Sequence, residues 1–216
     1  MAQQSAKTSS RGEQTRQQIL DAALRVLAQQ GYRALTHRAI AKEAGVSLSL
    51  TTYHFKDLEA LLHDAFAYYK HSVLNEFEGR WEALYEEYLL PSLEQARREN
   101  DRTALVEMLA KYMTELIESD IAERSEGVAV EMTFHFDLHL EEEQRNFAYE
   151  LCNRLFPRIH EFYRQMKTKD PETDANLLLD VAHFLRFRRL AVPEMLSRED
   201  VYLRLHRLLT TQLVSG

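Results

Sequence analysis

The hydrophobic positions of residues 15–62 repeat with a helical period and are interrupted by turn residues. The first apolar stripe, spaced i, i+4, i+7 and i+8, consists of Ile19, Ala23, Val26 and Leu27. Gly31 follows this stripe, where the end of a helix favours a positive φ. Thr36 and Ser47 stand where N-caps would start two further short helices, and Gly45 lies in the turn between them. The pattern therefore predicts a helix-turn-helix, in which a short turn containing glycine joins two helices.

The rest of the chain also has the apolar spacing of helices, so the expected fold class is all-α. Further helices are predicted from Asp57 to about residue 80, and over residues 81–98 with a break near Pro91, 102–119, 141–166 with a kink or restart at Pro157, 176–192 and 199–213. Residues 121–140 are ambiguous, because apolar residues alternate there as in a strand. We expect a disordered arm over residues 1–12, a helix-turn-helix domain over 13–60 and a helical domain over 61–216.

Composition is that of an ordinary globular protein. The 216 residues are 45% hydrophobic and 28% charged, and no run of 18 apolar residues predicts a membrane span. The first residues lack the apolar core of a secretory signal, and the single Cys152 has no partner for an internal disulfide. These features predict a cytoplasmic protein with no membrane partner.

Charge is distributed unevenly along the chain. Residues 1–56 contain eight basic and three acidic residues, a net charge of +5, whereas the whole chain carries −7 and the remainder must therefore carry −12. A basic segment of this kind supplies the salt-dependent attraction to phosphates. This uneven charge distribution is consistent with an N-terminal segment that binds a polyanion, although basic surfaces without that role are common.

The motif residues of this segment occur in a fixed order: Thr15, Arg16, residues 19–23, Gly31, Tyr32, Thr36, Arg38, Ile40, Ala41, residues 44–47, residues 53–55 and Leu61. In this order and spacing the segment resembles the N-terminal domain of the TetR family of bacterial transcriptional regulators. The resemblance implies a homodimer that binds palindromic double-stranded operator DNA through its N-terminal domains. It also implies a C-terminal domain that binds a small-molecule effector and releases the DNA, and it favours helix for residues 121–140.

Several positions depart from the family pattern. Leu48 and Ser49 replace a basic residue and a glycine, and Thr51 and Thr52 replace a Leu-Tyr pair. We expect these changes to alter the contacts with DNA rather than the fold. The residues expected to contact DNA are Thr36, Arg38, Ser47, Ser49, Thr51, Thr52, Tyr53, His54 and Lys56.

The helical domain contains candidates for an effector pocket and for a dimer interface. The pocket candidates are Trp81, Tyr85, Tyr88, Tyr112, Met113, Glu131, Met132, Phe134, His135 and Phe162, although each could equally fill a core. An aromatic lining suits either a hydrophobic or a cationic ligand. The last two helices are apolar on more than one face, which fits either a core or a four-helix dimer interface through Leu178, Val181, Leu185, Val201, Leu205 and Leu208. Nearby, Arg186, Arg188 and Arg189 are expected to pair with acidic groups of the same domain.

Metal binding and catalysis receive little support from the sequence. Glu131, His135 and His139 share one face of a helix and could ligate zinc, but an acidic solvated face is the favoured interpretation. No metal or cofactor is expected. The sequence contains no glycine-rich phosphate loop, GxSxG or HExxH motif, so we do not expect an enzyme. The alternatives to a repressor are a metal-responsive regulator and a dimeric ligand-binding or adaptor protein whose DNA-binding domain has lost its function.

Overall fold

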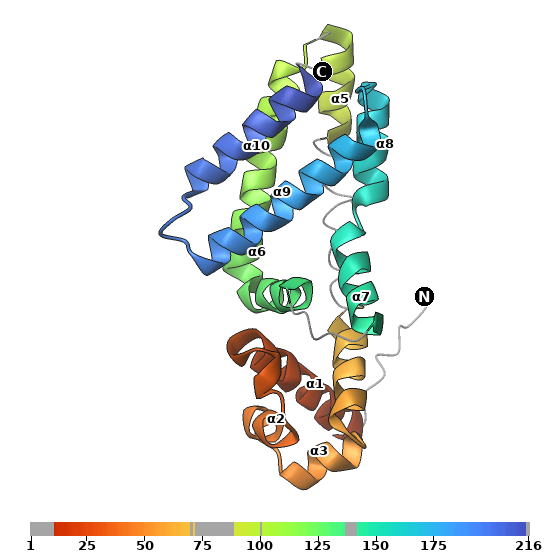
Figure 1. The fold of residues 1–216 in the computed structure, drawn as a ribbon, viewed down its shortest axis with the longest axis vertical. Coiled ribbons are helices and arrows are strands. Elements are labelled where there is room, and N and C mark those ends of the chain that lie inside the picture. Colours follow the sequence, from red (N-terminus) through yellow and green to blue (C-terminus); the bar gives the residue numbers. More distant parts are fainter. Residues whose placement is uncertain (1–10, 70, 72–88, 100, 137–141, 215–216) are drawn as a thin grey trace, which may run out of the picture. The chain divides into compact units, whose positions relative to one another are not determined.

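The computed structural model describes residues 11–69, 71, 89–99, 101–136 and 142–214. The regular elements of these residues are all helices (Figure 1), which confirms the predicted all-α class. The chain separates into two compact units, Met1–Glu76 and Phe77–Gly216. Among the described helices, none is both long enough and apolar enough to cross a bilayer.

The first unit contains α1 (Arg11–Gln30), the short 3-10 helix η1 (Tyr32–Ala34), α2 (His37–Ala44), α3 (Leu48–His54) and a helix over residues 58–69. Helix α1 begins at Arg11, so the last two residues of the predicted disordered arm, 11 and 12, are helical. The predicted domain boundary after residue 60 falls inside the helix that follows α3, and this helix lies in the first unit. Its first turn is capped as expected, because the Asp57 carboxylate accepts a hydrogen bond from the Ala60 N–H at 2.9 Å.

The second unit contains α5 (Leu90–Glu99), α6 (Thr103–Phe136), α7 (Glu142–Asn153), α8 (Phe156–Met166), α9 (Pro171–Ala191) and α10 (Arg198–Leu213). Pro91 lies in the first turn of α5, and the part of the predicted helix before residue 89 lies outside the described residues. Pro157 lies in the first turn of α8, where the chain restarts as predicted. Helix α9 starts at Pro171, earlier than expected, because Asp170 caps it and a proline at the first position needs no hydrogen-bonded N–H.

The ambiguous segment after residue 120 is helical as far as Phe136, so the strand alternative is wrong for that part. Residues 137–140 of this segment lie outside the described residues. Helix α6 is kinked at Arg124, where φ is −135° and ψ is 29°. The kink lets the two limbs of α6 run in different directions, which the long helical segment in Figure 1 shows.

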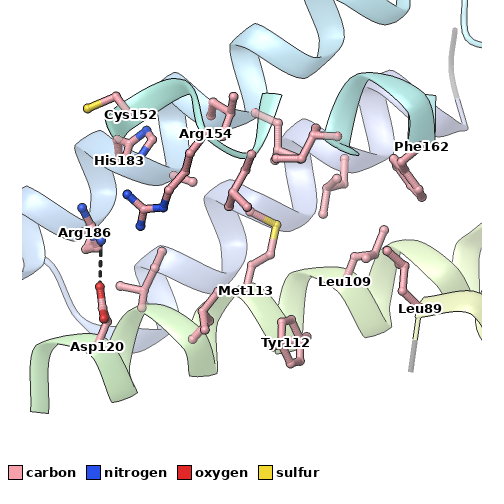
Figure 2. Close-up of a pocket in the computed structure, with 18 of the residues that line it drawn as sticks. Leu89, Leu109, Tyr112, Met113, Asp120, Cys152, Arg154, Phe162, His183 and Arg186 are labelled. Carbon is pink, nitrogen blue, oxygen red and sulfur yellow. Dashed lines mark hydrogen bonds and ion pairs between the residues drawn. The ribbon is translucent and has the colours of Figure 1, made fainter. Parts of the chain in front are cut away.

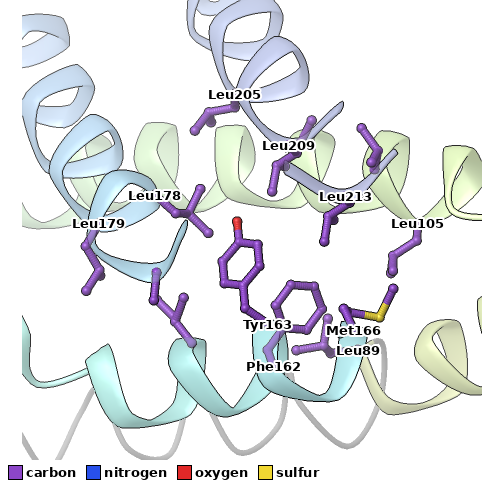
Figure 3. Close-up of a cluster of buried hydrophobic side chains, with 14 of the residues drawn as sticks. Leu89, Leu105, Phe162, Tyr163, Met166, Leu178, Leu179, Leu205, Leu209 and Leu213 are labelled. Atoms are coloured by element: carbon purple, nitrogen blue, oxygen red, sulfur yellow. The ribbon is translucent and has the colours of Figure 1, made fainter. Parts of the chain in front are cut away.

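The core of the second unit forms where α6, α8, α9 and α10 pack against one another (Figure 3). Its fully buried side chains include Leu105, Tyr163, Leu205, Leu209 and Leu213. The Tyr163 hydroxyl donates a hydrogen bond to the Gln212 side-chain oxygen, and the Gln212 amide donates to the Asp174 carbonyl at 3.0 Å. The polar groups that enter this core are therefore hydrogen-bonded, as buried groups require.

Arg102 closes the end of this core. Its guanidinium donates hydrogen bonds to the backbone carbonyls of Leu213 and Met166, each at 2.9 Å. These carbonyls lie at the C-terminal ends of α10 and α8, where intrahelical partners are absent. A single side chain thus satisfies acceptors of two helices and holds their ends together.

Candidate nucleic-acid interface and ligand cavity

Helices α2 and α3 are joined by a turn that the local sequence specifies. The Thr36 hydroxyl accepts a hydrogen bond from the Ala39 N–H at 3.1 Å and so caps α2. Gly45 ends α2 in the left-handed region, with φ 67° and ψ 27°, and the Val46 N–H then bonds to the Ala41 carbonyl at 3.0 Å. The Ser47 hydroxyl caps α3 by accepting from the Leu50 N–H at 3.3 Å. The result is the predicted helix-turn-helix.

Helix α3 presents an exposed face that could meet a duplex. Its exposed side chains are Leu48, Ser49, Leu50, Thr52 and Tyr53. The Tyr53 side chain is the most exposed of these large groups, at 82%. Its ring meets the half-buried His54 ring edge-on, with 5.3 Å between centroids. The face combines hydroxyl and apolar groups and contains no lysine or arginine.

Thr51 requires a correction to the predicted contact set. Its side chain is fully buried, and its hydroxyl donates to the Leu48 carbonyl at 2.8 Å. A threonine at this position therefore packs into the first unit and cannot reach a base edge in this conformation. Sequence spacing did not reveal this, because adjacent helical residues are rotated by about 100° and a seven-residue helix is too short for the pattern to show which face is buried.

The basic residues of the first unit divide into internally paired and exposed groups. Arg25 of α1 pairs with Glu43 of α2 at 2.8 Å, and Arg16 pairs with Asp64 in the helix after α3. These two arginines therefore hold the helices together. The exposed basic side chains of the described unit are those of Arg11, Arg33, Arg38, Lys42 and Lys56. Of the predicted phosphate contacts, Arg38 and Lys56 thus lie on the surface, as does Thr36.

A cavity of about 130 Å³ lies within the second unit (Figure 2). Aliphatic side chains from α6, α8 and α9 form most of its wall, together with the predicted Tyr112, Met113 and Phe162. The predicted Glu131, Met132 and His135 are not among its lining residues. The remaining candidates, Trp81, Tyr85, Tyr88 and the side chain of Phe134, lie outside what the structure describes.

One end of the cavity carries charge, which the sequence analysis did not anticipate. Figure 2 shows Arg154, His183 and Arg186 gathered near Asp120, away from Leu89 and Phe162. The Arg186 guanidinium donates to the Asp120 carboxylate at 2.7 Å and also bonds to the Glu131 carboxylate. Arg186 thus pairs with acidic groups of its own domain, as predicted. Both of its ion pairs are buried.

The same carboxylates tie the two limbs of α6 together across its kink. Arg124, at the kink, lies 2.8 Å from the Asp120 carboxylate and 3.7 Å from that of Glu131. Further along α9, Arg189 pairs with Glu118 at 2.9 Å, as expected. Helices α6 and α9 are thus joined by two sets of ion pairs, one buried and one partly exposed.

The charge network shifts the protonation of its neighbours. Burial raises the pKa of Glu131, but the positive charges of Arg186, Arg154 and Arg124 outweigh it, and the pKa is lowered overall. Burial lowers the pKa of His183 to about 3, and the charges of Arg186 and Arg154 add to this effect. Burial, followed by the charge of Glu131, raises the pKa of the Cys152 thiol. At neutral pH the histidine and the cysteine are therefore uncharged.

The possible zinc ligands do not come together in the described part of the chain. The Glu131 carboxylate is engaged by Arg186, and the His135 ring nitrogen lies 3.4 Å from the Cys152 sulfur. His139 lies outside the described residues. Among the residues that the structure does describe, no group of three or more histidine, cysteine, aspartate or glutamate side chains could hold a metal ion.

The predicted dimer residues need a second correction. Leu178, Leu185, Val201 and Leu205 are buried in the core of their own unit, while Val181 and Leu208 are partly buried against it. The exposed apolar side chains of these helices are Leu177 and Phe184 of α9 and Leu203 of α10. The sequence showed that both helices have apolar residues on two faces, but packing decided which face is internal.

Known proteins share both the helix-turn-helix and the fold. Residues 19–65 match the family described as "Bacterial regulatory proteins, tetR family". This segment of the chain is therefore similar to the DNA-binding domain of TetR-family regulators. Among curated TetR-type relatives, the regulator AcrR of Shigella flexneri is 33% identical over 111 residues, which is 48% of this chain and 51% of the relative. The regulator TtgW of Pseudomonas putida is 34% identical over 84 residues, 36% of this chain and 63% of the relative. The chain thus spans about half to two thirds of these relatives.

Solved TetR-fold structures extend the likeness over nearly the whole chain. A Rhodococcus transcriptional regulator has a TM-score of 0.65 at 20% identity and covers 93% of this chain and 96% of its own. The multidrug binding protein EbrR, in complex with malachite green, has a TM-score of 0.58 at 25% identity and covers 89% of this chain and 96% of its own. These matches confirm the predicted all-α fold class.

Proposed function

We propose that this protein is a TetR-family transcriptional repressor, active as a homodimer on palindromic operator DNA and released by a small-molecule effector. The observation that carries the proposal is the exposed face of α3, held at a fixed angle by the Gly45 turn. The second helix of a helix-turn-helix lies in the major groove and reads base edges. Ser49, Thr52 and Tyr53 offer hydroxyls there, and Leu48 and Leu50 offer apolar contacts of the kind that thymine methyl groups accept.

Exposed apolar groups on the last two helices support the dimer. Phe184 is 52% exposed and Leu203 54% exposed, and exposed large apolar side chains are candidates for an interaction surface. An isologous two-fold interface would use the same face of both copies. It would also present two copies of α3 about 34–36 Å apart, or a multiple of that distance, which is the geometry that a palindrome requires.

The cavity supports the effector role. EbrR was solved with malachite green, with ethidium and with imidazole, so a similar fold holds small molecules. Binding can release DNA only if the effector prefers a conformation that binds DNA poorly. A repressor works where the genome is, so we place this protein in the cytoplasm.

The test is fluorescence anisotropy with the DNA upstream of the protein's own gene, measured over a range of salt concentrations. Arg38→Ala should weaken binding to all sequences and reduce the slope of log K against log salt by about 1, as loss of a phosphate contact does. The matched control is Lys169→Ala, which removes an exposed charge from the second unit and should change neither quantity.

Tyr53→Ala completes the test, because this exposed side chain is the largest on α3. It should reduce operator affinity while leaving the unfolding temperature unchanged. A wild-type protein that ignores every genomic fragment at low ionic strength would overturn the proposal. The exposed Leu48 and Leu50 would then favour the alternative, a domain that docks on another protein.

A further inference from the structure

The cavity of the second unit has charged residues at one end, but the surface that faces it is almost wholly apolar. Leu89 and Phe162 lie at one end, and Asp120 and Arg186 lie at the other (Figure 2). Polar atoms nevertheless contribute almost nothing to the surface of the cavity. A molecule inside it would therefore touch apolar atoms on nearly every side.

The charged side chains at this end are engaged with one another. The Arg186 guanidinium bonds to the carboxylates of Asp120, at 2.7 Å, and of Glu131, and Arg124 lies 2.8 Å from the Asp120 carboxylate. The positive charge of Arg154 also acts on Glu131 and helps to lower its pKa. Buried charges that compensate one another in this way do not require a charged ligand of either sign.

Two titratable side chains in the wall show how the cavity treats each sign of charge. Burial is the main cause that lowers the pKa of His183 to about 3, and nearby guanidinium groups add to it, so a positive charge is disfavoured. Burial is also the main cause that raises the pKa of the Cys152 thiol. The carboxylates of Glu131 and Asp180 add to this rise, and it persists although guanidinium groups oppose it, so a negative charge is disfavoured as well. An ion of either sign would thus lose hydration that the cavity does not replace.

The volume of the cavity, about 130 Å³, limits the size of its occupant. An apolar cavity of roughly 150 Å³ holds one benzene-sized molecule. We propose that this cavity binds a small neutral, largely apolar molecule of the size of one substituted aromatic ring, held by contact with the wall rather than by the charged groups. Of the hydrophobic and cationic ligands that an aromatic lining suits, this selects the hydrophobic one. The inference rests on the proposed function only for the role of this molecule as the effector.

The test uses four probes of nearly the same planar shape, titrated calorimetrically into the full chain near neutral pH. Acetophenone and isopropenylbenzene are neutral, benzoate is an anion and benzamidine is a cation. Each neutral probe should bind at least about tenfold more tightly than either ion, because the apolar wall does not replace the hydration that an ion gives up. Isopropenylbenzene, which lacks the carbonyl oxygen, should bind at least as tightly as acetophenone.

Three results would overturn the proposal. The first is an ion that binds within about tenfold of the neutral probes, and the second is failure of both neutral probes to bind. The third is acetophenone that binds about tenfold more tightly than isopropenylbenzene, because that preference requires a polar partner in the cavity. Ethidium, with which EbrR was solved, is a permanent cation and should not displace acetophenone.

Ala182 lines the cavity from α9, so Ala182→Leu tests whether the probes bind there. The larger side chain should fill part of the cavity, weaken both neutral probes at least about tenfold and leave the Tm unchanged or raised. The matched control is Ala191→Leu, the same change at the exposed last residue of the same helix, which should alter neither quantity. Unchanged affinity in Ala182→Leu would refute binding in this cavity. If Ala182→Leu does not fold, as judged by thermal melting, the order of the four probes on the wild type decides.

Operator binding in the presence of each probe separates this inference from the proposed function. Tight binding of the neutral probes without any loss of operator occupancy would support the ligand class and refute its role as effector. Release of the operator by benzoate or benzamidine, but by neither neutral probe, would retain the regulator and overturn the neutral ligand.

Discussion

Replacing Arg186 with methionine removes the link between α9 and both limbs of α6. The arginine donates to Asp120 at 2.7 Å and to Glu131, and all three side chains are at most 8% exposed. Methionine retains much of the apolar stem but no charge, so both carboxylates lose one of the guanidinium groups that they share. Arg124 remains close to each carboxylate and keeps part of the compensation.

The expected loss of stability follows from the burial of the pair. Removing one member of a buried ion pair costs about 3–5 kcal/mol, because the other charge is left without its partner. With Arg124 still in place we expect the lower end, about 3 kcal/mol. For a protein of this size that corresponds to a fall of roughly 6–12 °C in Tm.

The pH dependence has a defined sign. In the wild type the lowered pKa of Glu131 contributes stability that is present above the unfolded pKa and is lost as the pH falls through the folded pKa. Without Arg186, burial should raise the folded pKa of Glu131 above its unfolded value of about 4.3. The charged carboxylate then destabilises the variant at neutral pH, and protonation relieves this as the pH falls. The difference between wild type and variant should therefore be smaller at about pH 5 than at about pH 7.

The assay is urea unfolding followed by circular dichroism at these two pH values. The matched control is Arg189→Met, the same change on the same helix, because the Arg189–Glu118 pair is more exposed, at 21% and 23%. The control should lose about 1 kcal/mol or less. An Arg186→Met protein as stable as the wild type, or one whose deficit does not change with pH, would refute the role assigned to the buried network.

Two further substitutions test local geometry. Gly45→Ala should destabilise the first unit by about 1 kcal/mol, because φ is +67° and a Cβ there meets no other atom, so the cost is purely conformational. Gly45→Asn should cost less, because asparagine adopts a positive φ more readily than alanine. Equal losses of stability for the two variants in urea unfolding would contradict this explanation. Tyr163→Phe should cost about 1–2 kcal/mol, because the Gln212 oxygen loses its buried donor. The exposed Tyr149→Phe is its control in the same measurement and should be neutral.

The sequence alone determined the helix-turn-helix, because its signals are local. The caps at Thr36 and Ser47 and the positive φ of Gly31 depend on residues within one helical turn, and the structure forms each as predicted. Family resemblance then indicated a class of protein. The exposure of Arg38 and Tyr53 also agrees with the residues that the pattern selected.

Only tertiary structure decided the rest, because the deciding contacts join residues far apart in the chain. Arg186 meets Asp120 and Glu131 at separations of 66 and 55 residues, and no sequence period marks such a pairing. Packing likewise sent Leu205 into the core and left Leu203 exposed, although both are leucines two residues apart on one helix. A pattern of hydrophobic residues shows that a helix has an apolar face, but the neighbouring helices determine which face is buried and where a cavity forms.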